Sequence, residues 1–368
     1  MFQPSQLTYN TFKMCAAAIL VSLVSGPVMA QEKPAEKKLK VGFVYVGPIG
    51  DYGYSYQHEM GRQAVIKKFG DKVETMFLEN VPESDSERSI EQLARAGNDI
   101  IFSTSFGFMD PTIKVAKRFP KVKFEHATGY KRADNVATYA AKFNDGRYVT
   151  GVIAGKMTKS GVIGYIASFP IPEVISGINA YYLGAKSVRP DVKIKIVWAN
   201  SWYDPTKEAD AAKALLDQGV DILAQHTDSP APLQAAEARG KHGFGQASDM
   251  KNFAPKAQLT SIVNNWGDYY IERVQAVMDG TWKSTDTWYG LDKNMVIMAP
   301  YDNMPDDVKK LAEDTATAIA FHTLDPFSCP MKKQDGSDVT CEGEGKLSDN
   351  QVRSMNFFVE GIDEKVPQ

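Results

Sequence analysis

Residues 39–46 read LKVGFVYV, and this short stretch decides the fold class. Its apolar and β-branched residues form an almost unbroken run, which is typical of a strand buried on both faces. Residues 47–50 (GPIG) end the strand, and helical spacing of apolar residues follows from Tyr56 to Phe69. Because a strand followed at once by a helix is the first half of a βαβ unit, the sequence predicts a parallel sheet wrapped by helices.

The same alternation continues and defines two lobes. Further strands are predicted at 73–78, 99–103 and 122–125 and helices at 86–96 and 111–119, which completes a first series. A second series follows a break marked by glycine, with helices at 148–157, 174–188 and 206–217 and strands at 162–166, 193–198 and 221–224. We therefore expect an α/β protein with two doubly wound parallel-sheet lobes joined by a hinge.

Residues 1–30 have the pattern of a secretory signal peptide. Lys13 precedes an apolar run that is too short to span a bilayer, and Gly26-Pro27 ends it. Val28 and Ala30 supply the small side chains that a signal peptidase reads, so we expect cleavage after Ala30 and a periplasmic protein. A lipid anchor on Cys15 is the alternative, but the residues before Cys15 lack the apolar-small pattern that such processing needs.

Composition and charge restrict the class of protein. The chain has 368 residues, 43% hydrophobic and 24% charged, which suits a globular protein of about two domains. The 42 basic residues nearly balance the 45 acidic ones, so the chain lacks the basic character of a nucleic-acid-binding protein. After signal removal two cysteines remain, Cys329 and Cys341, and in an oxidising compartment we expect them to form a disulfide that closes the loop 325–345.

The sequence contains no signature of an enzyme. A GxSxG elbow, a Walker phosphate loop, HExxH and GxGxxG after the first strand are all missing, and the five histidines are scattered. We expect no catalytic residue, no metal and no cofactor. His58 lies inside a predicted helix, where a surface or capping role is favoured over an acid–base pair with Asp51. His126 and His226 follow predicted strands, and for each a role as a pocket hydrogen-bonder stays open.

Aromatic and polar side chains gather just after three predicted strands. In doubly wound folds, ligands bind at the carboxyl ends of the strands. Rings that stack on a ligand's faces and Asp, Asn or Ser that read its edge suit a flat, hydrogen-bonding molecule. The three groups are Asp51, Tyr52, Tyr54 and Tyr56; Ser105, Phe106 and Phe108; and Asn200, Trp202, Tyr203 and Asp204.

With these features on an exported two-lobed chain, the sequence resembles the basic membrane protein (Bmp) family of ABC transporter substrate-binding proteins, which includes purine nucleoside receptors. The resemblance implies the type I periplasmic binding fold and covers most of the mature chain. Its motifs are VGFVYVGPIGDYGYS (41–55), SFGFMDPTIKVAKRFP (105–120), FNDGRYVTGVIAGKMTKSGVIGYI (143–166), ISGINAYYLGAKSVRPD (175–191), WANSWYDPTKEADAAKALLDQGVDIL (198–223) and LTSIV (259–263).

The family's ligand contacts are carried over only where this chain matches. Asp51 is similar to the Asp of the first loop, Tyr54 and Trp202 to the stacking rings, and Phe106 to the Gly-Phe position. Asp249 also matches a family position.

Two further carboxylates are candidates from their positions alone. Asp204, next to Trp202, is either an acceptor for a base N–H or a helix N-cap before Pro205. Asp228, after the following strand, is a second candidate acceptor.

The resemblance also bears on the choice between base and nucleoside. Nucleoside receptors of the family hold ribose with an Asp and a Lys, and here the corresponding stretches carry Ala247 and Asn264. The implied ligand is a free purine base, namely adenine, guanine, hypoxanthine or xanthine, because ribose loses its partners. A nucleoside, a sugar or another small solute is the alternative, and an exported nucleoside hydrolase is a weaker one.

The expected mechanism is capture by closure of two lobes. We assign 39–142 plus about 264–320 to the N-terminal lobe and 143–263 plus part of the C-terminal tail to the other. Hinge strands are expected near 137–143 and 259–264. The closed form would deliver its ligand to an ABC permease in the inner membrane, with the receptor acting as a monomer.

Overall fold

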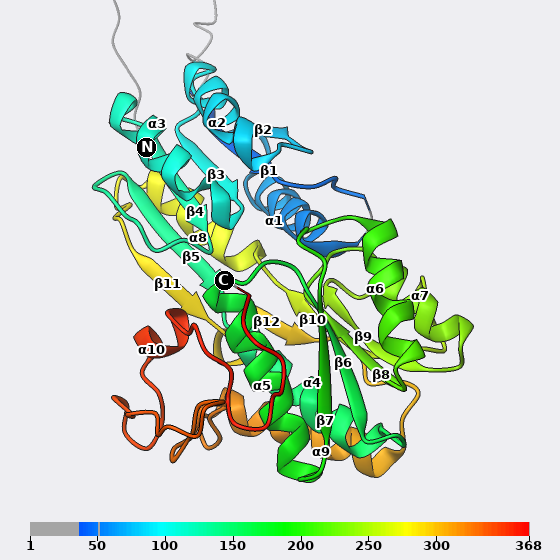
Figure 1. Ribbon diagram of the computed structural model, residues 1–368. Coiled ribbons are helices and arrows are strands. Elements are labelled where there is room, and N and C mark those ends of the chain that lie inside the picture. Colours follow the sequence, from blue (N-terminus) through cyan, green and yellow to red (C-terminus); the bar gives the residue numbers. More distant parts are fainter. Residues whose placement is uncertain (1–36, 51, 368) are drawn as a thin grey trace, which may run out of the picture. The chain divides into compact units, whose positions relative to one another are not determined.

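The computed structural model describes residues 37–50 and 52–367. The predicted signal peptide and Asp51 lie outside these residues. In the part described, two six-stranded sheets are each covered by helices on both faces, as Figure 1 shows. Among the helices of these residues, none combines the length and the hydropathy of a membrane-spanning segment. The predicted fold class, two doubly wound lobes, is confirmed.

The first lobe is built on an all-parallel sheet with the order β11-β5-β4-β3-β1-β2. Helices α1 and α8 pack on one face and α2 and α3 on the other, because each presents an apolar stripe to the buried strands. The elements are β1 Leu39–Tyr45, α1 Gly53–Phe69, η1 Gly70–Lys72, β2 Val73–Leu78, η2 Glu83–Asp85, α2 Ser86–Arg95, β3 Ile100–Thr104, η3 Phe106–Phe108, α3 Met109–Arg118, β4 Lys123–Ala127, β5 Val136–Ala141, α8 Gly267–Met278 and β11 Asp286–Tyr289.

The second lobe has the sheet order β12-β10-β9-β8-β6-β7, in which β12 alone is antiparallel to its neighbour. Helices α4, α5 and α9 share one core and α6 and α7 another. The elements are α4 Phe143–Met157, β6 Val162–Ala167, α5 Pro172–Val188, β7 Lys193–Trp198, α6 Pro205–Asp217, β8 Ile222–Gln225, α7 Ala231–Ala238, β9 His242–Ala247, β10 Gln258–Asn264, η4 Leu291–Lys293, β12 Val296–Met298 and α9 Asp306–Ala320.

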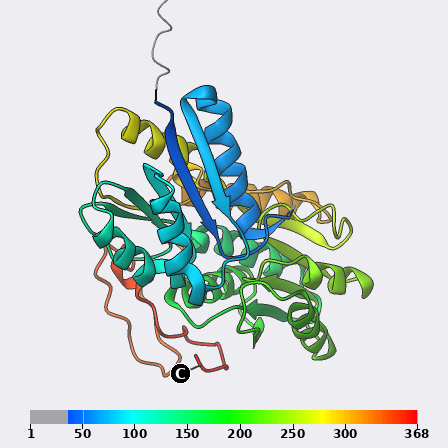
Figure 2. The same cartoon turned by 90° about the horizontal axis from the view of Figure 1, so that it is seen from above.

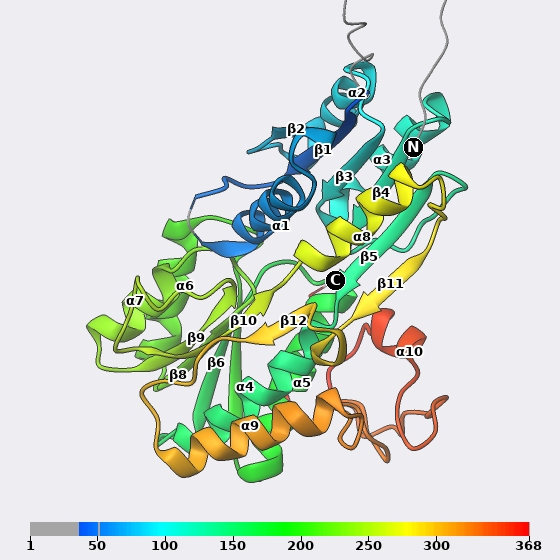
Figure 3. The same cartoon turned by 180° about the vertical axis from the view of Figure 1, so that it is seen from behind.

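The stretch 264–320 is divided between the lobes, whereas the sequence analysis assigned all of it to the first. Helix α8 and strand β11 do join the first lobe, but β12 pairs with β10, and α9 runs beside α4 and α5, as Figure 3 shows. The physical reason is the apolar face of α9, where Val308, Ala312 and Ile319 complete the core of the second lobe. The chain therefore crosses between the sheets three times, after β5, β10 and β11.

The C-terminal segment packs on the second lobe. The predicted disulfide is confirmed, since Cys329 and Cys341 are bonded. The short helix α10 (Asp349–Arg353) follows, and Phe358 beyond it is buried in the second-lobe core. Figure 2 shows this segment, in orange and red, at the edge away from α6 and α7. Arg353 reaches β11, where Nη1 donates to Oδ2 of Asp286 at 2.6 Å.

Candidate functional site

A cavity lies where the carboxyl ends of the strands of both sheets converge, which is the binding position of doubly wound folds. We define the first wall as its lining from the first lobe and the second wall as its lining from the second lobe. Phe143, the first residue of α4, lines the cavity where the chain crosses between them. The first wall is Val46, Tyr54, Ser105, Phe106 and Thr128, and the second wall is Glu173, Trp202, His226, Asp228 and Gln246.

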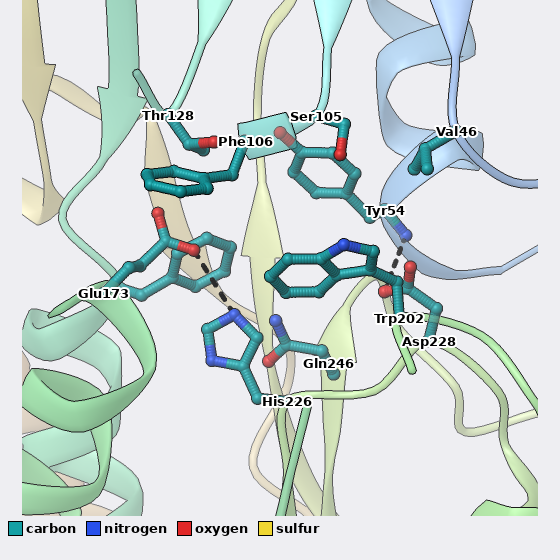
Figure 4. Close-up of a pocket in the computed structure, with 11 residues that line it drawn as sticks. Val46, Tyr54, Ser105, Phe106, Thr128, Glu173, Trp202, His226, Asp228 and Gln246 are labelled. Atoms are coloured by element: carbon teal, nitrogen blue, oxygen red, sulfur yellow. Dashed lines mark hydrogen bonds and ion pairs between the residues drawn. The ribbon is translucent and has the colours of Figure 1, made fainter. Parts of the chain in front are cut away.

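Aromatic rings from both lobes line the cavity. In Figure 4 the ring of Phe106 lies on the upper side and the indole of Trp202 on the lower side. Phe169 supports the indole edge to face, with ring centroids 5.0 Å apart, and Trp202 Nε1 donates to Glu83 Oε1 of the first lobe at 3.2 Å. Two such rings offer stacking surfaces to a flat ligand, and base–aromatic stacking contributes about 1–3 kcal/mol per base.

Asp228 follows β8, and its half-buried carboxyl group lines the cavity. Its Oδ1 accepts a hydrogen bond from the backbone N–H of Tyr54, at the start of α1, at 3.3 Å. Burial is the largest cause that raises the pKa of Asp228 well above its ordinary value, and the nearby carboxylate of Glu208 adds to it. A carboxyl group keeps acceptor lone pairs in either protonation state, so Asp228 suits a ligand that presents an N–H group.

Glu173 and His226 form a pair on the same wall. Glu173 is in the first turn of α5, and its Oε1 lies 3.3 Å from His226 Nε2. Burial lowers the pKa of His226, so the imidazole is neutral near pH 7, and Nε2 must carry the proton that Glu173 accepts. The remaining lone pairs of the Glu173 carboxylate can accept from a ligand.

Hydrogen bonds cross between the two lobes beside the cavity. The N–H of Gly53 donates to Ser248 Oγ at 2.6 Å, and the hydroxyls of Tyr52 and Tyr203 lie 3.2 Å apart. The bonds Tyr54–Asp228 and Trp202–Glu83 also cross between the lobes. Asp228 and Trp202 thus face the cavity and fasten the two lobes at the same time.

The structure brings together four of the candidate residues. Tyr54, Phe106, Trp202 and Asp228 all line the cavity. Asp51 lies outside the described residues.

The other three candidates lie outside the lining. Asp204 is the N-cap of α6, accepting from the N–H of Lys207 at 3.1 Å, which is the capping role that the sequence allowed. Asp249 is exposed and accepts from the side chain of Gln258. Asn264 is fully buried at the end of β10, and its amide has no hydrogen-bond partner among the described residues.

The structure decides the roles of the three histidines considered in the sequence analysis, His58, His126 and His226. His58 is fully buried, not a surface or capping residue, because its ring stacks on Trp266 with centroids 4.7 Å apart. His126 is buried beside Ser105, whose carbonyl oxygen lies 2.8 Å from Nε2, and it does not line the cavity. Only His226, of the two strand-end histidines, reaches the cavity.

Glu173 and Gln246 are lining residues that the sequence analysis did not single out. Glu173 lies in the loop-to-helix junction after the predicted strand 162–166, but an acidic residue in a first helix turn is common and does not by itself indicate a binding site. For Gln246, inside strand β9, no local pattern separates it from a core position. Across residues 37–50 and 52–367, no group of three or more His, Cys, Asp or Glu side chains is placed to hold a metal ion.

Two lobes, a cavity between the strand ends and closing hydrogen bonds define a two-lobed solute-binding protein. The chain belongs to the family of PnrA-like ABC transporter substrate-binding proteins (Bmp), whose model matches residues 38–322. The members are solute-binding proteins and not enzymes, and membership implies a small-molecule ligand and a membrane permease as partner.

Three relatives place the chain within this family and fold. A purine-binding protein of Brucella abortus (strain 2308) is 59% identical over 351 residues, covering 95% of this chain and 100% of that protein. An ABC transporter protein of Haloferax volcanii, proposed to bind glucose, is 36% identical and covers 91% and 83%. The crystal structure of a solute-binding protein from Aeropyrum pernix K1 has a TM-score of 0.68 at 18% identity, covering 86% and 96%, and shows the shared fold.

Proposed function

We propose that this protein captures a free purine base, such as adenine, guanine, hypoxanthine or xanthine, between its lobes and delivers it to an ABC permease. The observation that carries the proposal is the pairing of Phe106 and Trp202 from opposite lobes around a cavity that also holds Asp228 and Glu173. Rings stack on the faces of a purine, and carboxylates accept its N–H groups. The similarity to a purine-binding protein supports the same ligand class.

The residues at the positions that hold ribose in nucleoside receptors support a free base as the ligand. Ala247 and Asn264 occur at those positions, and neither lines the cavity. A ribose would therefore enter without the charged partners that its hydroxyls need, which lowers affinity because polar groups lose hydrogen bonds to water without replacement.

The route to the site of action is part of the proposal. The N-terminal pattern supports export with cleavage after Ala30, and the disulfide Cys329–Cys341 suits an oxidising compartment such as the periplasm. Intact-mass measurement of the protein recovered from the periplasm would give a chain that starts at Gln31. A lipid-modified chain that starts at Cys15 would contradict this.

The experiment that tests the ligand class is mass spectrometry of what the purified protein releases on denaturation. We expect a purine base in near-stoichiometric amount. The Asp228→Ala variant, purified in parallel, should release much less purine base than the wild type. Release of a nucleoside would contradict the choice of base, and release of a sugar would contradict the purine class.

A further inference from the structure

Arg147 is a fully buried cation directly behind the second wall. It belongs to α4, is 0% exposed, and its guanidinium carbon lies 5.2 Å from the ring centroid of Tyr165. Among the described residues no carboxylate forms an ion pair with it, and its Nε and Nη1 have no hydrogen-bond partner. A buried charge without a counter-ion is costly, so its retention calls for a role.

Arg147 donates a hydrogen bond to a residue that lines the cavity. Nη2 of Arg147 donates to Oε1 of Gln246, which is 2% exposed and lines the cavity. A guanidinium has donors only, so the amide atom that faces Arg147 must be the oxygen. The amide NH₂ of Gln246 is therefore directed away from Arg147, and Figure 4 shows its nitrogen on the cavity side.

The second wall then has a defined hydrogen-bond pattern. Asp228 and Glu173 present carboxyl oxygens that can accept hydrogen bonds, while Gln246 presents an N–H donor. If the amide of Gln246 were free to rotate, it would offer a donor or an acceptor equally well, and the wall would read the ligand less selectively.

We propose that Arg147 is a positioning residue that holds Gln246 with its NH₂ toward the cavity, so that the ligand must present a hydrogen-bond acceptor to this side. For a purine the acceptor is a ring nitrogen or an exocyclic oxygen. The ligand class in this inference rests on the proposed function, whereas the orientation of the amide rests on the Arg147–Gln246 contact.

The test is calorimetric titration of the full mature protein with adenine and with 1-deaza-, 3-deaza- and 7-deazaadenine, each of which replaces one ring nitrogen by C–H. For the wild type we expect one of the three analogues to bind about tenfold more weakly than adenine, as loss of a single hydrogen bond predicts. In Gln246→Leu that difference should fall below about twofold. In Arg147→Met it should shrink in the same way, because the amide is no longer held.

Two controls separate positioning from mere structural support. Arg147→Lys retains donors only and should keep the discrimination, and the double variant Arg147→Met/Gln246→Leu should lose no more of it than Gln246→Leu alone. If Arg147→Met fails to fold, Gln246→Glu tests whether the ligand needs a hydrogen-bond donor at this position. This variant keeps a partner for Arg147 but replaces the donor by an acceptor, so adenine affinity should fall more than about 30-fold.

The outcomes are distinguishable. Wild-type discrimination retained in Arg147→Met, or full adenine binding by Gln246→Glu, overturns the positioning role while leaving purine binding intact. A wild-type protein that binds neither adenine nor its analogues, nor any other purine base, overturns the proposed function, and with it the ligand class assigned to this wall.

Discussion

The two walls of the cavity differ in chemistry although both come from strand ends of similar sheets. The first wall offers apolar and hydroxyl side chains, with Phe106 as its stacking ring. The second wall carries both carboxylates, the imidazole and the amide of the lining, with Trp202 as its ring. Because charged and amide groups distinguish donors from acceptors on a ligand edge, the second wall identifies the ligand and the first covers it.

The largest effect is expected for Asp228→Ala in the second wall. The change removes an acceptor for a ligand N–H and the acceptor for the backbone N–H of Tyr54, so purine affinity should fall about 100-fold. Calorimetric titration measures the loss. Asp249→Ala in the same lobe is the matched control, since this carboxylate is exposed and outside the cavity, and should bind as the wild type. An equal loss of purine affinity in both variants would contradict the assignment of Asp228 as a ligand-binding residue.

Phe106→Ala in the first wall should weaken all purine bases by a similar factor of about ten, because a stacking surface is lost but no edge is read. Affinities for adenine, hypoxanthine and guanine, measured side by side, check this. Their ratios should match those of the wild type. A changed order of preference among the three bases would show that the first wall also discriminates between ligands. This would contradict the assignment of selectivity to the second wall.

Glu83→Gln tests the fastening of the walls to one another. Glu83 Oε1 accepts from Trp202 Nε1, from Ser105 Oγ at 2.5 Å and from Gly107 N at 3.0 Å. An amide oxygen accepts these bonds more weakly than a carboxylate, so closure should be less favourable and affinity about threefold lower. Small-angle scattering with saturating purine should still report the closed form. Glu79→Gln, an exposed neighbour on the same lobe, serves as control, and an equal change there would contradict the assignment.

The smallest effect on purine affinity is expected for His126→Gln. His226→Gln is the variant with which it is compared. Burial lowers the pKa of His126 to about 4, so the unfolded chain binds an extra proton as pH falls below 6.5, and stability is lost in that direction. Removing His126 should recover about 2 kcal/mol of the loss in unfolding free energy between pH 7.5 and 5, measured by urea denaturation.

Binding separates the two histidines. His226→Gln should also flatten the pH dependence of stability, because burial lowers the pKa of His226 as well. Only this second variant should alter purine affinity, since His226 lines the cavity and His126 does not. A change in affinity in His126→Gln would contradict the placement.

Most strands and helices as far as residue 224, and their order, could be predicted from sequence because each has a local pattern. Residues 39–46 and 162–166 are apolar runs between turn signals, and the structure has strands there. The position of α9 could not be predicted in this way. An apolar helix face does not by itself show which sheet the helix will cover. Helix α9 packs beside α4 after the pairing of β12 with β10 has returned the chain to the second lobe.

Residues that line the cavity could be predicted from sequence where they lie within a few residues of the end of a strand. Phe106 and Asp228 were found for this reason. Gln246 lies within β9, where the direction of a side chain depends on the whole sheet. Glu173 has the appearance of an acidic residue in a helix first turn after Pro172, a common helix-start feature, and nothing local separates that role from ligand binding.

The most direct test of the account is calorimetric titration of the ligand-free mature protein with adenine, hypoxanthine, adenosine and inosine under one buffer condition. We expect at least one free base to bind with a Kd of about 1 µM or below, a binding free energy of about −8 kcal/mol, and its nucleoside to bind at least about 100-fold more weakly. Equal or tighter binding of the nucleoside would contradict the choice of base, and no heat with any purine would contradict the ligand class.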